Sequence, residues 1–115
     1  MVKISRSDLE VSLNQAFDLL EGGDTVRARL MLEVLRDQLP SDPAVAFGCG
    51  AAAMQEKDFG AAVNYLREAI LLAPGVAVFH ETLGKSLAAQ GRAKEAEDQF
   101  RHALEISPDM AESRA

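Results

Sequence analysis

The chain has 115 residues and a formal net charge of −6, from 12 Lys and Arg against 18 Asp and Glu. This acidic balance argues against a nucleic-acid partner, because phosphate backbones are bound by clustered Lys and Arg, and no apolar run approaches the roughly 18 residues of a membrane span. The single Cys49 permits no internal disulfide, and the first residues lack the apolar stretch of a signal peptide. We therefore expect one cytoplasmic domain over residues 1–115, with no membrane insertion.

The first predicted element is a helix over residues 8–21. Ser7 followed by Glu10 has the spacing of a capping box, in which the two side chains satisfy free backbone N–H groups at a helix start. The apolar residues behind it share one helical face, namely Leu9, Leu13, Phe17 and Leu20. Gly22 and Gly23 then permit a tight turn.

A second helix is predicted after Asp24, which can act as its N-cap. Its apolar residues have the i, i+4, i+7 spacing of a buried stripe, and the same stripe returns twice further along the chain: Ala28, Leu32 and Leu35; Ala62, Leu66, Ala69 and Ile70; Ala96, Phe100, Ala103 and Leu104. Between the first two stripes, Asp42 and Pro43 have the pattern of an N-cap and first helical residue, because proline's missing N–H is unpaired there in any case.

A 34-residue period organises these elements. Pro40, Pro74 and Pro108 are each 34 residues apart, and each is predicted to end the helix before it. Small residues repeat with the same period at two further positions: Ala16, Gly50 and Gly84, and then Ala28, Ala62 and Ala96. Small side chains at these positions let two helices of one unit approach closely. The chain is thus divided into three units over residues 9–42, 43–76 and 77–110.

This pattern resembles the tetratricopeptide repeat, a 34-residue helix-turn-helix unit with small residues, a large apolar residue and a proline at matching positions. The third unit matches best, through Gly84, Ala96, Phe100, Ala103 and Pro108. The resemblance implies an all-α, right-handed α-solenoid of three repeats with six or seven helices. In this family the first helices of the repeats line a concave surface.

Short fragments that imitate catalytic motifs do not meet the spacing that their chemistry needs. Lys85 and Ser86 after Gly84 look like the end of a phosphate-binding loop, but that loop needs glycine at residue 79, which is Phe79. His80 and Glu81 begin a zinc-protease pattern whose second histidine would fall at Gly84. We expect a satisfied packing histidine at 80, a buried structural thiol at Cys49, and no enzyme activity, cofactor or metal site.

The function therefore depends on the concave surface. The resemblance points positions two, five, nine, twelve and thirteen of each first helix into this groove, and we select as the partner-binding residues Leu13, Phe17, Leu20, Phe47, Ala51, Met54, Glu81 and Lys85. The groove is apolar over two repeats and mixed at the third, which predicts a partner that inserts apolar anchors as a peptide or amphipathic helix. The alternative is that Leu13 and Leu20 belong to the core.

One subclass of the family grips the acidic C-termini of heat-shock chaperones through a clamp of Lys, Asn and Arg side chains. The residues at the clamp positions of this chain are Leu13, Phe17, Gly48, Val78 and Thr82. None of them can donate the charged hydrogen bonds of a carboxylate clamp. We therefore predict a protein-interaction adaptor of a different specificity.

Two other interpretations stay open at this point. Only residues 111–115 follow the third unit, so the last helix, within residues 93–106, is expected to lack a covering helix. It could self-associate, accept Val2 and Ile4 of another copy, or be covered by a further repeat if the chain is a segment of a longer protein. In a third and more distant interpretation, the repeats position substrates for a catalytic domain elsewhere.

Overall fold

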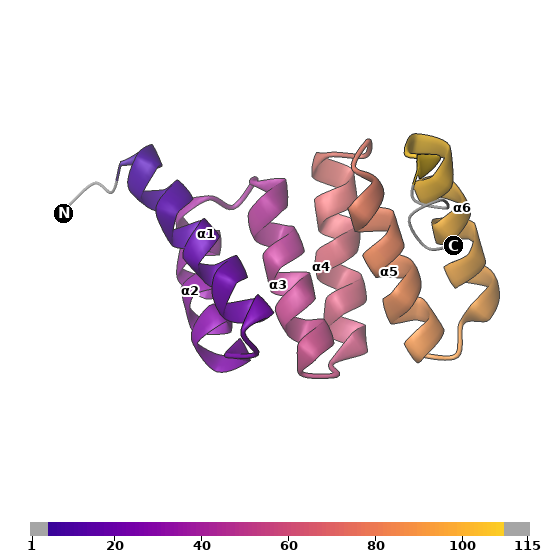
Figure 1. The fold of residues 1–115 in the computed structure, drawn as a ribbon, viewed down its shortest axis with the longest axis horizontal. Coiled ribbons are helices and arrows are strands. Elements are labelled where there is room, and N and C mark those ends of the chain that lie inside the picture. The colour runs from indigo at the N-terminus through magenta and orange to yellow at the C-terminus, as the bar shows by residue number, and fades with distance from the viewer. Residues whose placement is uncertain (1–4, 110–115) are drawn as a thin grey trace.

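The computed structural model describes residues 5–109, and within this range the chain folds into six α-helices joined by short turns. In chain order, as seen in Figure 1, they are α1 (Arg6–Glu21), α2 (Thr25–Gln38), α3 (Pro43–Gln55), α4 (Phe59–Leu72), α5 (Ala77–Ala89) and α6 (Ala93–Ile106). The predicted all-α helical repeat solenoid is confirmed. The expected contacts of Val2 and Ile4, the tail after the third unit and any seventh helix fall outside the described residues.

Aspartate side chains cap three of the helices. Asp24, Asp42 and Asp58 each accept a hydrogen bond from a backbone N–H in the first turn, at 3.3, 2.9 and 3.2 Å. These bonds satisfy donors that have no partner inside the helix. The predicted caps at Asp24 and Asp42 are confirmed. The helices α2, α4 and α6 each end two residues before the repeated proline, as predicted.

The predicted start of the first helix is wrong by two residues. The N-cap is Ser5, whose Oγ accepts a hydrogen bond from the backbone N–H of Asp8 at 3.2 Å. Ser7 lies inside the first turn, so Ser7 and Glu10 do not form the capping box. Both serines are followed by an acidic residue three positions later, and the earlier pair is used because it lengthens the helix and adds backbone hydrogen bonds.

The turn inside each helix pair contains one residue with left-handed backbone. The φ angle is 84° at Gly23, 79° at Gly91 and 61° at Lys57. Glycine adopts this conformation without strain, whereas the Cβ of a lysine crowds the neighbouring carbonyl. The middle turn is therefore strained where the first and third turns are not.

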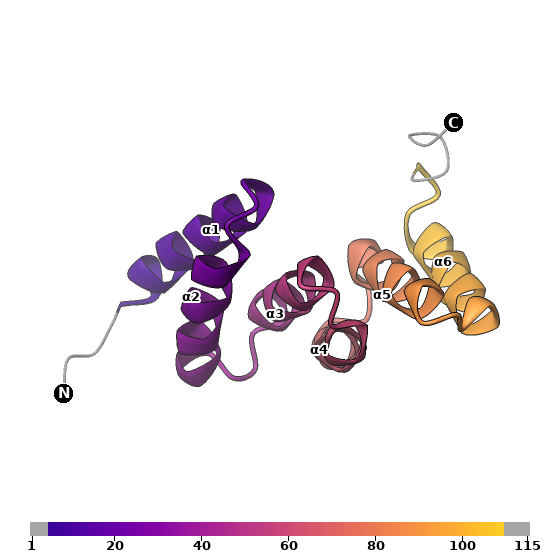
Figure 2. The ribbon, with the colours of Figure 1, turned by 90° about the horizontal axis from the view of Figure 1, so that it is seen from below.

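The helix pairs approach one another more closely on one side of the row. α1 contacts α3 and α3 contacts α5, whereas no Cα atom of α2 comes within 8 Å of α4, nor any of α4 within 8 Å of α6. Figure 2 shows α1, α3 and α5 along one side, with α2 and α4 opposite. The row is curved toward the first helices. We call the side of α1, α3 and α5 the inner surface and the other side the outer surface.

Small residues in α3 let the neighbouring second helices pack closely against it. Ala and Gly make up more than half of the helix, and most of them are buried. A Cβ added to Gly48 would meet Cδ2 of Leu32 in α2 at 2.6 Å. A larger residue at 48 would thus push α2 away from α3, because packed interiors have no spare volume.

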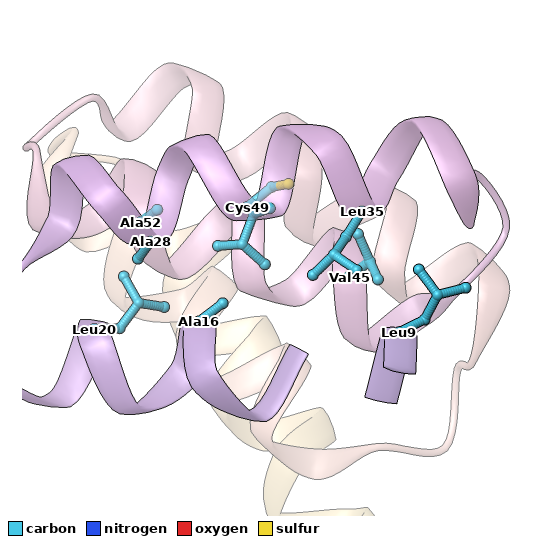
Figure 3. Close-up of a cluster of buried hydrophobic side chains, with 9 residues drawn as sticks. Leu9, Ala16, Leu20, Ala28, Leu35, Val45, Cys49 and Ala52 are labelled. Carbon is cyan, nitrogen blue, oxygen red and sulfur yellow. The ribbon is translucent and has the colours of Figure 1, made fainter. Parts of the chain in front are cut away.

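The predicted stripes of the second helices form the core. Ala28, Leu32 and Leu35 are at most 2% exposed, and Figure 3 shows side chains of α1, α2 and α3 converging in this N-terminal cluster. Two further clusters continue the core toward α6. Leu104 was expected in the third stripe but is 42% exposed, because no described element covers that side of α6. Within residues 5–109, each helix is too short or too polar to cross a bilayer.

Candidate functional site

A row of phenylalanine rings connects the first helices along the inner surface. The rings of Phe17 in α1 and Phe47 in α3 stack with centroids 6.0 Å apart, and Phe47 stacks on Phe79 of α5 at 5.1 Å. The interplanar angles are 28° and 26°, so the rings lie nearly parallel. Phe79 is only 6% exposed, while the other two are half-buried. The row joins all three repeats, and Phe17 and Phe47 keep part of their surface free.

Most of the predicted groove residues of the first two repeats are half-buried. Leu13, Phe17 and Ala51 pack against the N-terminal cluster, and Phe47 and Met54 pack against the central one. They support the core with one side of their side chains and keep the other accessible.

Leu20 does not belong to this set. It is 5% exposed and belongs to the N-terminal cluster, where Figure 3 shows it beside Ala28. The assignment of Leu20 to the groove is therefore wrong. The physical reason is its place on α1: it lies on the side of the helix that faces α2 and α3, where its whole side chain is enclosed.

The third repeat contributes charge to the inner surface. Glu81 and Lys85, one turn apart on α5, form an ion pair with Nζ and Oε1 3.1 Å apart. The Lys85 side chain is 52% exposed and the Glu81 side chain 12% exposed, so the lysine is the accessible member of the pair. The middle of the surface has the opposite character, since α3 contains no charged residue.

Hollows open on the outer surface. One of about 400 Å³ lies between α2 and α4 above Cys49, and another of about 390 Å³ lies between α4 and α6 above His80. Both follow from the curvature, because the second helices diverge where the first helices meet. On the inner surface the stacked rings of Phe17, Phe47 and Phe79 lie between the first helices.

His80 is a hydrogen-bonded packing residue, as predicted. It is 8% exposed, and its ring nitrogens lie 2.9 Å from Oε1 of Gln99 and 3.0 Å from the carbonyl oxygen of Pro74. The ring of His102 lies 5.6 Å away, centroid to centroid, on the solvent side. In the described part of the chain, no three His, Cys, Asp or Glu side chains are grouped to hold a metal ion.

Cys49 is the buried thiol that was expected. It is 7% exposed in the core between α2 and α3. Burial raises the pKa of the thiol to about 11, because the surrounding apolar groups disfavour the thiolate, and nearby Arg36 offsets only part of this effect. At neutral pH the thiol is protonated and is a poor nucleophile.

The α6 helix, the second candidate from the sequence, exposes a small apolar area. Leu104 is 42% and Ile106 40% exposed, while Ala96 and Ala103 are buried. Exposed acidic residues of α6 surround this area, among them Glu97, Asp98 and Glu105. Glu97 and Asp98 are paired with Arg101 at 3.4 Å, so within residues 5–109 Glu105 is the unneutralised one of these three acids.

Similar arrangements occur in several solved structures. An O-GlcNAc transferase from Thermobaculum terrenum is 26% identical, with a TM-score of 0.89 over 95% of this chain, but the chain spans only 21% of that protein. The type III secretion translocator chaperone SycD of Yersinia enterocolitica is 22% identical, with a TM-score of 0.87 and coverage of 98% of this chain and 88% of SycD. Both comparisons match the chain almost from end to end.

A third similar structure is the first tetratricopeptide-repeat domain of Spaghetti (RPAP3) bound to an HSP90 peptide. It is 17% identical, with a TM-score of 0.85 over 95% of this chain and 86% of that one. Among curated proteins, no sequence matches significantly. A sequence model of the tetratricopeptide repeat matches residues 53–115, more than half of the chain. Together with the six helices in three pairs, this match shows that the chain belongs to the tetratricopeptide repeat family.

Proposed function

We propose that the protein is a non-catalytic adaptor that binds a segment of another protein along its inner surface. The contact residues in this proposal are Leu13, Phe17, Phe47, Ala51, Met54, Glu81 and Lys85. The observation that supports it best is the stack of Phe17 on Phe47, in which both rings stay half-buried rather than enclosed. Partly exposed aromatic rings supply much of the energy of protein interfaces, because they bury a large area at a low cost in conformational entropy.

The shape of this surface favours a partner that lies across it. The accessible faces of Phe17 and Phe47 form an apolar area over α1 and α3. An amphipathic helix or extended segment can cover this area with Leu, Met or aromatic side chains. Each such side chain that is fully buried contributes about 1.5–3 kcal/mol, against an association cost of about 4–15 kcal/mol, so we expect micromolar affinity.

The distribution of charge along the first helices indicates which kind of partner segment fits them. The middle helix is uncharged, and α1 carries Asp8, Glu10, Asp18 and Glu21 against a single Arg6. A partner with an apolar centre and a basic end over α1 would complement this distribution. Lys85 could receive one acidic residue at the other end, in exchange for its contact with Glu81.

An acidic chaperone tail is a poor candidate for the partner. The Spaghetti (RPAP3) domain is described with an HSP90 peptide, but this chain has no basic or amide side chain at the five positions of the clamp. At Gly48 there is no space for the asparagine side chain of a clamp, because a Cβ there would lie 2.6 Å from Leu32 and 3.5 Å from Phe17.

The proposal is tested by capturing partners from the source cell with the immobilised protein and quantifying them by mass spectrometry. Phe17→Glu and Phe47→Glu should each reduce capture at least about tenfold, which corresponds to roughly 1.4 kcal/mol and lies within the value of one buried ring. The matched control is Leu71→Glu, which places the same charge on the outer surface at a side chain that is 85% exposed.

Circular dichroism must show that each variant keeps its helices. If Phe47→Glu unfolds the protein, Ala51→Glu introduces the charge beside the same rings without removing one of them. Capture that persists in both inner-surface variants and is lost in Leu71→Glu would reject the inner surface and move the interaction to the outer one.

A further inference from the structure

A strip of apolar side chains runs along the exposed side of α2. Val26, Leu30 and Val34 are spaced four residues apart and are 59%, 52% and 59% exposed. This spacing keeps them on one broad face of the helix. We call these three residues the α2 strip. A run of large apolar side chains left in water along a helix marks an interaction surface more often than scattered exposure does.

The repeat itself does not require apolar residues at these positions. One period later, in α4, the equivalent residues are Gly60, Asn64 and Glu68, and two periods later, in α6, they are Lys94, Asp98 and His102. The other two repeats thus form the same helix pairs with only glycine or polar residues at these three positions. The α2 strip is specific to the first repeat and has a reason outside the packing of the solenoid.

The absence of a described repeat before α1 does not explain the exposure of Val26 and Leu30. In the second repeat, Gly60 and Asn64 are exposed although a helix pair precedes them, and Lys94 and Asp98 are likewise exposed in the third. Val11 of α1 behaves differently. It is 55% exposed, but its equivalents Val45 and Phe79 are 0% and 6% exposed, because the preceding pair covers them. A preceding repeat would therefore cover Val11 and leave Val26 and Leu30 open. The equivalent of Val34, Glu68, is half-buried and pairs with Arg36 of the preceding helix pair, so a preceding repeat would cover part of Val34.

We propose that the α2 strip is a homodimer interface, in which α2 of one copy packs antiparallel on α2 of a second copy around a two-fold axis at Leu30. A two-fold interface must be self-complementary. The strip has this property, since Leu30 faces Leu30 of the other copy and Val26 faces Val34 at both ends. Each valine meets a side chain of its own shape, and the central leucines meet on the axis.

The charges beside the strip permit two copies to meet. The protein is acidic overall, so most of its surface repels a second copy. The three arginines of α2, in contrast, each pair with an acid of the same chain: Arg27 with Asp24 at 3.5 Å, Arg29 with Glu33 at 3.2 Å and with Glu56 at 3.1 Å, and Arg36 with Glu68 at 2.8 Å. Apart from Asp37 near its end, α2 thus carries its charges in neutralised pairs, which suits contact with an identical surface.

A hollow beside the strip adds to the apolar area. It has a volume of about 320 Å³, and Leu30 and Val34 form one wall, with Leu9, Met31 and Leu35 among the other lining residues. One pair of short helices buries less than the roughly 800 Å² per partner of a standard stable interface. We therefore expect a weak dimer that dissociates on dilution.

The first test is the mass of the full chain in solution, measured by sedimentation over a concentration series. The wild-type mass should rise from one protomer toward two as concentration increases. Leu30→Glu should keep the mass at one protomer, because it places two carboxylates on the axis. Asn64→Glu is the matched control, with the same charge at the equivalent position of α4, and should associate like the wild type. Circular dichroism confirms that both variants fold.

Cysteine cross-linking tests the antiparallel packing of the two α2 helices. All of these variants also carry Cys49→Ala, so that the introduced cysteine is the one thiol in each chain. Facing residues of two packed helices come close enough for a disulfide. Leu30→Cys should form a covalent dimer under mild oxidation. Val26→Cys should cross-link poorly alone but readily when mixed with Val34→Cys, and Asn64→Cys should stay monomeric.

A wild-type mass of one protomer at all concentrations, or cross-linking of Leu30→Cys no greater than that of Asn64→Cys, overturns the dimer and leaves the strip to a different protein. An equal mass rise in the wild type and Leu30→Glu places self-association elsewhere on the chain and also rejects the proposal. These outcomes are independent of partner capture by Phe17 and Phe47, which lie on the inner surface.

Discussion

Gly84 of α5 lies directly against the ring of Phe100 of α6. A Cβ on residue 84 would come within 2.7 Å of Cε1 and 2.9 Å of Cδ1 of that ring. An aromatic ring cannot bend away as a flexible side-chain end can, so the contact sets how closely α5 and α6 approach. The repeated small residue at 84 thus lets the two helices of the unit approach closely by making room for a large side chain of the partner helix.

Gly84→Ala should lower the free energy of unfolding by about 1–2 kcal/mol. The clash costs on the order of 1–3 kcal/mol, and the better helix propensity of alanine returns up to about 1 kcal/mol. Gly60→Ala is the control, because a Cβ at Gly60 meets its nearest neighbour only at 3.9 Å. Denaturant unfolding should show Gly60→Ala neutral or stabilised. Equal effects of the two changes would contradict the proposed role of Gly84.

Lys57→Gly should stabilise the protein by up to about 1 kcal/mol. Residue 57 has a φ of 61°, a conformation that glycine adopts at the equivalent positions 23 and 91. Removing the Cβ relieves a backbone strain of about 1–2 kcal/mol. Part of this gain in stability is lost, because glycine gives the unfolded chain more conformational freedom. The thermal midpoint should rise by a few degrees. The reverse change, Gly91→Ala, should lower it, and a gain there would rule out strain as the cause.

Arg92→Asp should stabilise α6. Residue 92 is the N-cap of α6 and makes no side-chain capping bond, whereas the equivalent residues Asp24 and Asp58 both do. An aspartate cap contributes about 1 kcal/mol. The change removes the hydrogen bonds between Arg92 and Glu95 that lower the pKa of Glu95, but both side chains are exposed and their pair adds little. Arg92→Ala is the control, because it removes the ion pair with Glu95 without adding a cap. The difference in urea-unfolding free energy between Arg92→Asp and Arg92→Ala then measures the contribution of the new cap.

Cys49 should react slowly with alkylating reagents and make stability depend on alkaline pH. A pKa of about 11, against 9.0 for a free thiol, leaves about a hundredfold less thiolate near neutral pH. From about pH 9 to 11 the unfolded thiol ionises while the native one holds its proton, so stability falls as pH rises through this window. Between pH 8 and 10 the wild type should lose on the order of 1 kcal/mol more than Cys49→Ala. Parallel losses in the two proteins would show that the burial of this thiol has no such effect.

Local signals in the sequence predicted local structure well. Asp24 and Asp42 were identified as caps because capping depends on a side chain and backbone groups within one turn. The helix ends before Pro40, Pro74 and Pro108 were predicted for the same kind of reason. The start of α1 was missed because Ser5 and Ser7 offer the same local pattern, and only the whole helix decides between them.

The candidate site was predicted in part. Phe17 and Leu20 belong to the same apolar face of α1, yet Phe17 stays half-exposed while Leu20 is enclosed. The direction in which α2 and α3 lie against α1 separates the two, and periodicity carries no such information. The α2 strip was not predicted, although a signal existed. Leu30 stands where the other repeats have Asn64 and Asp98, and comparison of the repeats at their exposed positions would have found it.

The amino-acid sequence by itself determined the 34-residue period, the helix pairs, their caps and the buried stripes, because these depend on contacts between residues close in the chain or on a repeat that copies them. The tertiary structure decided which side chains remain accessible. The first helices meet while the second helices diverge, and this curvature leaves Phe17 and Phe47 half-buried on the inner surface and opens the hollows above Cys49 and His80.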